Sequence, residues 1–174
     1  LIATIYMAAD SAQIPRELLL GCALAEGNMN PAARRPADPA KDRKYWEPPD
    51  PQFDVSFGFM QQTVRWAAEY ADWCAEHDHD PDEYPGDDVI AQIGALYLDP
   101  KHAAKVAAEN LAGKYKRDEP DALLKALYRY NWPAGKGKPA SAEATANYTR
   151  GLTEAREILR AGQPAPISLP TGHG

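Results

Sequence analysis

The sequence predicts an all-α protein built as a single helical domain. Apolar residues recur at helical spacing through most of the chain, and no stretch alternates convincingly between apolar and polar residues with a period of two. The length of 174 residues suits one domain whose core folds without metal or disulfide staples. We expect this domain to occupy residues 1–161, with the Pro- and Gly-rich residues 162–174 forming a tail or linker.

The first two expected helices are rich in apolar residues. One begins near Pro15, whose fixed φ suits the start of a helix, and runs to about Glu26 with apolar side chains on nearly all sides. The next is expected over residues 63–76. Its buried stripe is expected to consist of Trp66, Tyr70, Trp73 and Cys74.

Four further helices follow from start signals and periodicity. Apolar residues from Val89 to Tyr97 mark one helix, and Asp99 with Pro100 forms the cap and first residue of the next. The inward positions of that helix are expected to be Val106, Asn110 and Leu111. Pro120 opens a helix that continues through Leu123, Leu127 and Tyr130. Ser141 is expected to cap the last helix, which carries Tyr148, Leu152, Ala155 and Leu159 at helical spacing.

Two internal segments are not expected to be helical. Residues 31–57 contain six prolines, which forbid a long helix, so this segment is a long functional loop or holds a little irregular strand. Residues 76–88 form a dense acidic loop. The opening residues 1–9 are apolar but lack the basic leader and cleavage pattern of a signal peptide.

Charge and hydropathy exclude some classes of partner. The formal net charge of −6 argues against nucleic acid, because phosphate binding needs clustered Lys and Arg. No run approaches the roughly 18 apolar residues that cross a bilayer, so membrane insertion is not expected. Cys22 and Cys74 lack other ligands at metal-binding spacing, and either a disulfide or two buried free thiols would fit.

Glu26 is the candidate catalytic residue. It lies four residues after Cys22 and eight after Leu18, so it continues the inner stripe of an apolar helix that stops at Gly27 and Asn28. Burial disfavours a carboxylate and raises its pKa. A carboxyl that stays protonated near neutral pH is what a general acid for glycosidic cleavage requires.

Three other segments carry candidate ligand-binding residues. Ser56 precedes a turn in which Gly58 lets the backbone approach a ligand, followed by Met60 and by Gln61, whose amide can bond a sugar hydroxyl or acetamido group. Near the end of the fifth helix, Tyr130 and Asn131 offer a ring and an amide. On the last helix, Tyr148 lies on the inward stripe, where a phenol needs a hydrogen-bond partner.

The order of these segments resembles the lytic transglycosylase and goose-type lysozyme superfamily. That family has an acid in a Glu-Ser-x-x-x-Pro-like segment, a Gly-Leu-Met-Gln turn, a Tyr-Asn pair and a late helical Tyr. The corresponding segments here are Glu26–Pro31, Gly58–Gln61, Tyr130–Asn131 and Tyr148, so the resemblance covers about residues 14–160.

The resemblance implies a lysozyme-like helical fold with a long Pro-rich loop over a cleft between the Glu26 helix and the Gly58 turn. It implies cleavage of peptidoglycan between N-acetylmuramic acid and N-acetylglucosamine, without cofactor or metal. Glu26 would act as acid and then base, giving 1,6-anhydromuramoyl products. Gln61 and Tyr130 would hold sugar, while Met60 and Tyr148 would shape the cleft.

The sequence departs from the family pattern in three places. Gly27 replaces the usual Ser after the acid, and Trp132 with the residues after it displaces the Gly that normally follows Tyr-Asn. The segment between Glu26 and Gly58 is longer than usual. It carries Tyr45 and Trp46, whose rings either stack on sugar as a flap or anchor the loop.

Several alternatives stay open at this point. An inverting lysozyme needs a second carboxylate about 6.5–9.5 Å away to activate water, and Asp54 is the best candidate, followed by Asp50 and Glu47. A chitinase or chitosanase of similar fold is a second alternative, and a non-catalytic wall-binding module is a third. Action on peptidoglycan places the protein in the cell envelope, in a secreted form or on a phage particle, as a mature form or a piece of a larger polypeptide.

Two charged segments remain outside this pattern. Asp78, Asp80 and Asp82 mimic the start of a calcium loop, but Glu83 and Val89 occupy positions that need Gly and Glu, which favours a solvated loop. Basic residues cluster in the Pro-rich segment, where they are either a solvated flap or contacts for acidic stem peptides and wall polymers. They are Arg34, Arg35, Lys41, Arg43 and Lys44.

Overall fold

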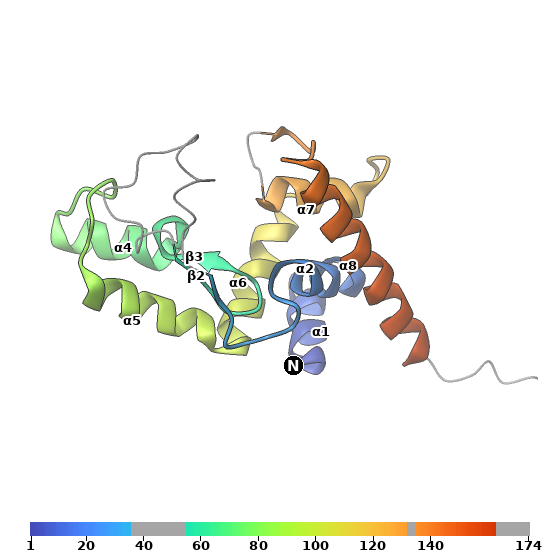
Figure 1. The fold of residues 1–174 in the computed structure, drawn as a ribbon, viewed down its shortest axis with the longest axis horizontal. Helices are drawn as coiled ribbons and strands as arrows, with labels where there is room; N and C mark the ends of the chain where they lie inside the picture. Colours follow the sequence, from blue (N-terminus) through green and yellow to red (C-terminus); the bar gives the residue numbers. More distant parts are fainter. Residues whose placement is uncertain (36–54, 132–134, 163–174) are drawn as a thin grey trace, which may run out of the picture.

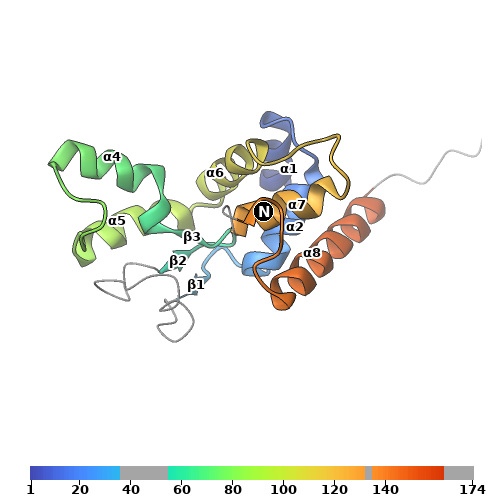
Figure 2. The same ribbon diagram turned by 90° about the horizontal axis from the view of Figure 1, so that it is seen from above.

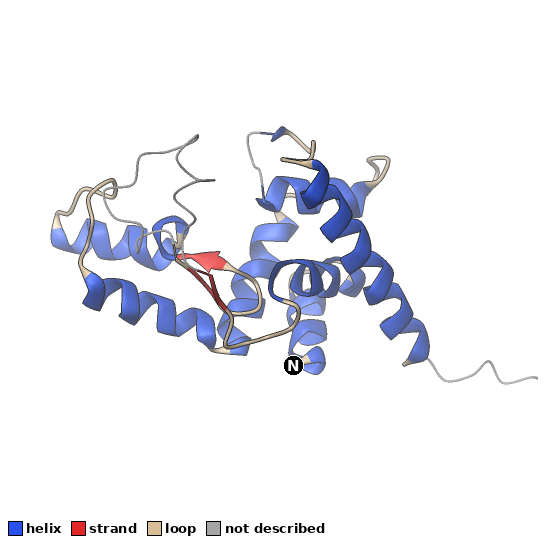
Figure 3. Ribbon diagram, viewed as in Figure 1, coloured by secondary structure: helices blue, strands red, loops and turns tan. Residues whose placement is uncertain are grey.

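The computed structural model describes residues 1–35, 55–131 and 135–162, and it is mostly helical (Figures 1 and 3). Within these ranges there are seven α-helices, one 3-10 helix and one small sheet. The helices are α1 (Ile2–Ser11), α2 (Arg16–Gly27), α4 (Ala68–His77), α5 (Asp87–Leu98), α6 (Pro100–Ala112), α7 (Ala122–Asn131) and α8 (Ala142–Ala161). The expected tail after residue 162 and the expected Pro-rich flap lie outside the described residues, apart from the ends of the flap.

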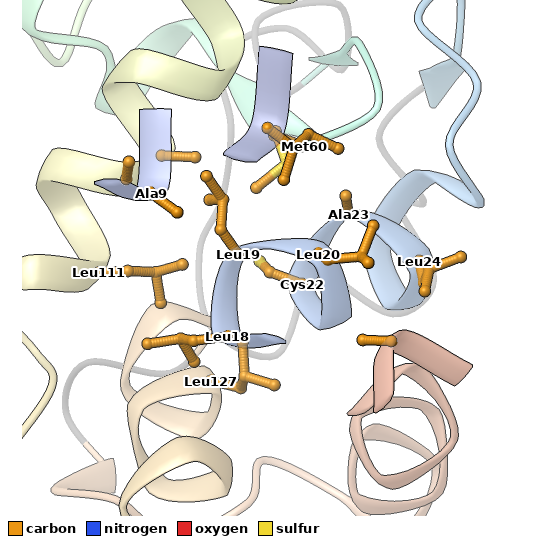
Figure 4. Close-up of a cluster of buried hydrophobic side chains, with 14 of the residues drawn as sticks. Ala9, Leu18, Leu19, Leu20, Cys22, Ala23, Leu24, Met60, Leu111 and Leu127 are labelled. Atoms are coloured by element: carbon orange, nitrogen blue, oxygen red, sulfur yellow. The ribbon is translucent and has the colours of Figure 1, made fainter. Parts of the chain in front are cut away.

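The helices form two groups with the sheet between them (Figures 1 and 2). Helices α1, α2, α6, α7 and α8 make the larger group, while α4 and α5 make the smaller one. Each group has its own buried apolar cluster. The larger cluster surrounds α2, in which every residue from Leu18 to Leu24 is buried (Figure 4). The prediction that this helix is buried nearly all round is therefore confirmed.

The sheet is antiparallel and very short. Strands β1 (Arg34–Arg35), β2 (Ser56–Phe57) and β3 (Gln62–Thr63) lie in the order β1-β2-β3. The turn between β2 and β3 crosses from one core to the other, because Phe57 belongs to the smaller cluster whereas Phe59 and Met60 belong to the larger one. Strands β1 and β2 lie within residues 31–57, where a little irregular strand was one of the two expectations. Two-residue strands leave no period-two pattern, so the sequence could not place them.

Helix α1 was not among the helices expected from the sequence. Its Ile5 and Ala9 are completely buried and lie four residues apart, where they pack on α2 and α6. The outer face carries the exposed Leu1, Ile2 and Met7, so the helix is apolar on both sides. An apolar segment without a polar face lacks the amphipathic signal that identifies a helix.

The expected helix over residues 63–76 begins later than predicted. Thr63 belongs to β3, Val64–Trp66 forms the 3-10 helix η2, and Ala67 is extended, so α4 starts at Ala68. Pairing of β3 with β2 takes the first residues out of the helix. As a result Trp66 is 75% exposed, and its expected place on a buried stripe is wrong, whereas Tyr70 and Cys74 are buried as expected.

The caps at Asp99 and Ser141 are as predicted, whereas α7 begins at Ala122 and not at Pro120, because Asp121 between them has φ 57°. The Asp99 carboxylate accepts a hydrogen bond from the backbone N–H of Lys101 at 3.0 Å, and the Ser141 hydroxyl accepts one from Ala144 at 3.0 Å. One inward position on α6 is wrong, since Asn110 is exposed while Leu111 is buried. Cys22 and Cys74 are both buried free thiols, one in each cluster.

Helices α2 and α8 pack closely because each has a glycine at the contact. A Cβ on Gly151 would lie 2.4 Å from the carbonyl oxygen of Gly21 and 3.1 Å from the Cβ of Ala25. A Cβ on Gly21 would lie 2.8 Å from the Leu152 side chain. The contact with Gly21 is to rigid backbone, so an added methyl group would push the two helices apart.

None of the helices in the described part of the chain has the length and apolar character needed to span a membrane.

The substitution Gly151→Ala is expected to lower the free energy of unfolding by about 1–3 kcal/mol, because the new methyl group overpacks the α2–α8 contact. This loss would occur although Ala favours a helix interior by about 1 kcal/mol over Gly. Gly162→Ala is the matched control at the end of the same helix, where the nearest atom would be 3.6 Å from the new Cβ. Urea denaturation of both variants measures the difference, and equal stabilities would contradict the close-packing argument.

Candidate active site

Glu26 lies in the last turn of α2, as the sequence predicted. The helix ends because Asn28 adopts a left-handed conformation with φ 47° and ψ 40°. The Glu26 side chain is only partly exposed and follows the buried Cys22 by one helical turn. A carboxylate here is close to the unpaired carbonyl groups at the helix C-terminus, which disfavour negative charge.

The pKa of Glu26 is raised from its ordinary value of 4.5, and the main cause is burial of the carboxyl group. Two groups act in the opposite direction: the hydroxyl of Tyr148 donates a hydrogen bond to Oε1 of Glu26, and the positive charge of Arg35 attracts the carboxylate. Burial outweighs both groups. Glu26 therefore holds its proton to a higher pH than an exposed glutamate does.

Tyr148 reaches Glu26 from α8 because of the glycine contact between the two helices. It lies three residues before Gly151 on the same face, so the close approach of the helix axes brings its ring to the end of α2. Only 3% of Tyr148 is exposed, and burial together with the charge of Glu26 raises its pKa far above the ordinary value. Tyr148 therefore stays neutral, and its hydroxyl group donates the hydrogen bond to Glu26.

The turn at Gly58 packs directly against the end of α2. A Cβ on Gly27 would lie 2.5 Å from both the Cα and the carbonyl oxygen of Phe59, so only glycine fits beside Glu26. Gly58 has φ +70°, and a Cβ there would lie 2.1 Å from the carbonyl oxygen of Tyr97. The departure at Gly27 from the resembled family pattern thus has a steric reason in this fold.

Tyr130 connects the turn to α7. Its hydroxyl donates to the backbone oxygen of Met60 at 3.1 Å and accepts a hydrogen bond from Nε2 of Gln62 at 2.6 Å. Burial raises the pKa of Tyr130 well above its ordinary value, and the charge of Glu26 contributes to the same direction. Tyr130 therefore fixes the turn next to the acid as a neutral phenol.

The structure brings most of the predicted residues together but changes the role of two. The side-chain amide of Gln61 donates to the carbonyl oxygen of Gly58 at 2.8 Å, so it closes the turn to which it belongs. The Ser56 hydroxyl shares a 2.9 Å hydrogen bond with the Thr63 hydroxyl across β2 and β3. Met60 is completely buried, whereas Asn131 is exposed at the end of α7.

Other predicted residues cannot be placed. Six of them lie outside the described residues. They are the two aromatic residues Tyr45 and Trp46, the candidate second carboxylates Asp54, Asp50 and Glu47, and Trp132.

Two residues near the acid were not singled out by the sequence for a role beside it. Gln62 is adjacent to the motif residue Gln61, and no spacing rule distinguishes the two amides before the turn is known. The sequence identified Arg35 only as one of several basic residues in the Pro-rich segment. Its position in β1 is what brings its charge close to Glu26.

The acidic loop after α4 is held by its own contacts. The Asp80 carboxylate accepts a hydrogen bond from the backbone N–H of Asp82 at 2.9 Å, and Asp82 forms an ion pair with Arg65 at 2.8 Å. Within residues 1–35, 55–131 and 135–162, no group of three or more His, Cys, Asp or Glu side chains is arranged to hold a metal ion.

Two surface pockets of about 320 Å³ lie away from Glu26. One is bounded by α4 and the acidic loop, including Cys74 and His79. The other lies between α7 and α8, including Leu124 and Arg156. Neither pocket includes Glu26 or a residue of the Gly58 turn, so the cleft between them stays a prediction.

No protein-family model matches the chain, and neither a curated protein nor a solved structure is significantly similar to it. Function is accordingly inferred from the site itself.

The raised pKa of Glu26 predicts how stability depends on pH. Since the folded state binds this proton more tightly than the unfolded state, Glu26 contributes stability below about pH 4.5 that is lost as the pH rises through its folded pKa. Gln does not titrate, so the free energy of unfolding of wild type should fall relative to Glu26→Gln between pH 4.5 and pH 8. Urea denaturation at both pH values measures this difference.

The control for this measurement is Glu109→Gln on α6, where the carboxyl is exposed to solvent. Glu109→Gln removes an exposed carboxyl group. The difference in free energy of unfolding between this variant and wild type should therefore change little with pH. A Glu26→Gln variant that behaves like this control would contradict the buried-acid assignment.

Proposed function

We propose that this protein cleaves the β-1,4 glycosidic bond between N-acetylmuramic acid and N-acetylglucosamine in peptidoglycan. In this proposal it is a lytic transglycosylase with a lysozyme-like fold and Glu26 as its catalytic acid. The substrate is a cell-wall polymer, so the protein acts in the envelope, after secretion or on a phage particle.

The convergence of distant segments on one carboxyl group supports this function. The end of α2, the Gly58 turn, the end of α7 and the start of α8 meet around Glu26 through the contacts of Gly27, Tyr130 and Tyr148. These are the segments whose order along the chain resembles the lytic transglycosylase and goose-type lysozyme superfamily. A purely structural glutamate at a helix end needs neither a raised pKa nor such surroundings.

The first chemical step uses the proton that burial keeps on Glu26. Glu26 gives this proton to the glycosidic oxygen as the bond from that oxygen to C1 of the muramoyl residue breaks. The carboxylate that forms has the Tyr148 hydroxyl as a donor and the charge of Arg35 nearby. Both groups stabilise Glu26 only in its ionised form, so they favour the transition state over the ground state.

The second step returns Glu26 to its starting state. The Glu26 carboxylate takes the proton from the 6-hydroxyl of the same muramoyl residue, and O6 forms a bond to C1. The product is a 1,6-anhydromuramoyl end, and no water is consumed. Among the described residues, the groups that act on the charge of Glu26 are Tyr148 and Arg35. The proposed reaction needs Glu26 alone, whereas hydrolysis would require a second carboxylate such as Asp54 to activate water.

Mass spectrometry of digested sacculi tests the proposal. Wild type should release muropeptides with 1,6-anhydro ends, which are lighter by one water than the hydrolytic products. Glu26→Gln should reduce release by about 10²–10⁴-fold, the usual contribution of a general acid. The exposed control Glu109→Gln should digest sacculi as wild type does.

The alternatives give different products in the same assay. Products that carry the added water would identify a lysozyme. Sacculi that are bound without release of soluble fragments would identify a non-catalytic wall-binding module. Cleavage of chitosan in place of sacculi would identify a chitosanase.

The contact between Tyr148 and Glu26 predicts the pH profile of Tyr148→Phe. The hydrogen bond lowers the pKa of Glu26, so its loss should move the alkaline limb of kcat/KM to higher pH. The maximal kcat should fall about 10–100-fold, since a hydrogen bond to a charged group contributes about 1.5–3 kcal/mol.

Tyr128→Phe is the matched control for this profile. The Tyr128 ring lies edge-on to that of Tyr148 with centroids 6.3 Å apart, and the substitution leaves the Tyr148 hydroxyl in place. Its alkaline limb should coincide with that of wild type. An unshifted limb in Tyr148→Phe would rule out Glu26 as the group that titrates in activity.

A further inference from the structure

The small sheet sorts its side chains onto two faces. Arg35 is paired with Ser56, and Ser56 is paired with Thr63, so these three side chains form a row on one face. The 2.9 Å hydrogen bond between the Ser56 and Thr63 hydroxyls agrees with this register.

The opposite face is occupied by packing contacts. The Arg34 guanidinium lies over the Phe57 ring, 5.1 Å from its centroid, and Gln62 donates to Tyr130. Phe57 itself is buried in the smaller core, where its ring meets Gly94. This face therefore holds the sheet to the rest of the protein and is not available to a ligand.

The row of Arg35, Ser56 and Thr63 is accessible and polar. Arg35 is exposed, and the two hydroxyl residues are partly exposed. Arg35 has no hydrogen bond or ion pair to any described residue, and no contact like that of the Arg34 guanidinium with the Phe57 ring on the other face is found for it among those residues. A guanidinium that is exposed and unpaired offers its full set of donors to an anion.

This row lies next to the candidate catalytic acid. The charge of Arg35 is close enough to Glu26 to act on its ionisation, and the turn that joins β2 to β3 packs on Gly27. In a protein with a net charge of −6, Arg35 places a positive charge beside the acid. This charge attracts anionic groups to the site.

We infer that Arg35, Ser56 and Thr63 form a subsite that binds the carboxylate-bearing 3-O-lactyl arm of muramic acid beside the bond to be cleaved. This inference rests on the proposed function. The Arg35 guanidinium matches a carboxylate with two parallel hydrogen bonds, and the Ser56 and Thr63 hydroxyls bond uncharged sugar hydroxyl or acetamido groups. The subsite distinguishes muramic acid from N-acetylglucosamine, which has no acidic arm.

The test compares Arg35→Gln with Arg34→Gln, its neighbour on the opposite face of the same strand. Three glycan substrates are used: strands with stem peptides, strands freed of peptides so that the lactyl carboxylate is exposed, and the latter after conversion of the carboxylates to neutral methylamides. Wild type and Arg34→Gln should cleave the peptide-free charged strands with a kcat/KM about 10–100-fold above that for the neutral strands. Arg35→Gln should lose this preference, with the same kcat/KM for all three substrates, and the loss should be mainly a rise in KM for the peptide-free charged strands.

The two charged substrates identify the source of the carboxylate. A preference for the peptide-free strands assigns the lactyl carboxylate itself, and a preference for the peptide-bearing strands assigns a carboxylate of the stem peptide. Equal cleavage of charged and neutral strands by wild type, or loss of the preference in Arg34→Gln alone, overturns the subsite.

Calorimetric binding separates this inference from the proposed function. Titration of the same strands into Glu26→Gln and into Glu26→Gln/Arg35→Gln does not depend on cleavage. Binding that requires both Arg35 and the carboxylate, in a protein whose wild type releases no product, would support the subsite and contradict the glycosidase. Cleavage by wild type with binding indifferent to Arg35 would contradict the subsite and leave the glycosidase standing.

Discussion

The close approach of the backbone to helix α2 is the constraint on which the rest of the structure depends. At Gly21 the helix meets Gly151 of α8, and at Gly27 it meets the backbone of Phe59, each at a distance that leaves no space for a Cβ. These contacts lie on two sides of one helix, and they fix α8 and the Gly58 turn relative to it. Because backbone atoms are involved, neither contact can adjust by a change of rotamer.

The carboxyl of Glu26 acquires its properties from this arrangement. It lies at the end of a helix whose preceding residues are buried, and α8 and the turn enclose it further. Removal of water raises its pKa, while Tyr148 and Arg35 favour the ionised form enough to stabilise the charge once it appears. An acid needs both conditions, since it must hold its proton before the reaction and tolerate the charge after release. Partners attached to different elements satisfy the two conditions separately.

The sheet adds polar and positively charged side chains to the region around Glu26. One face attaches it to the smaller core through Phe57 and to α7 through Gln62, and the other presents an arginine and two hydroxyl groups to solvent. Strands of two residues are sufficient for this purpose, because the alternation of side chains needs only neighbouring residues. Specificity for an acidic sugar would then come from the sheet and proton transfer from α2.

The sequence by itself determined the helical class, the end of α2 beside Glu26, the caps at Asp99 and Ser141, and the burial of Tyr148. Each of these follows from local spacing or from a single capping residue, so it can be read without knowledge of distant contacts. The segments around the acid could also be named in order from the sequence.

Only the tertiary structure decided which atoms meet. Local patterns did not separate Gln61, which closes its own turn, from Gln62, which reaches Tyr130 across 68 residues of sequence. They did not explain Gly27, whose reason lies in the backbone of Phe59, or bring the charge of Arg35 to Glu26. They also placed Trp66 on a buried stripe, because the pairing of β3 with β2 that shortens the expected helix is a contact between separate segments. Contacts between residues far apart in sequence depend on how the helices and strands pack against one another. The spacing of apolar residues along the sequence does not determine that packing.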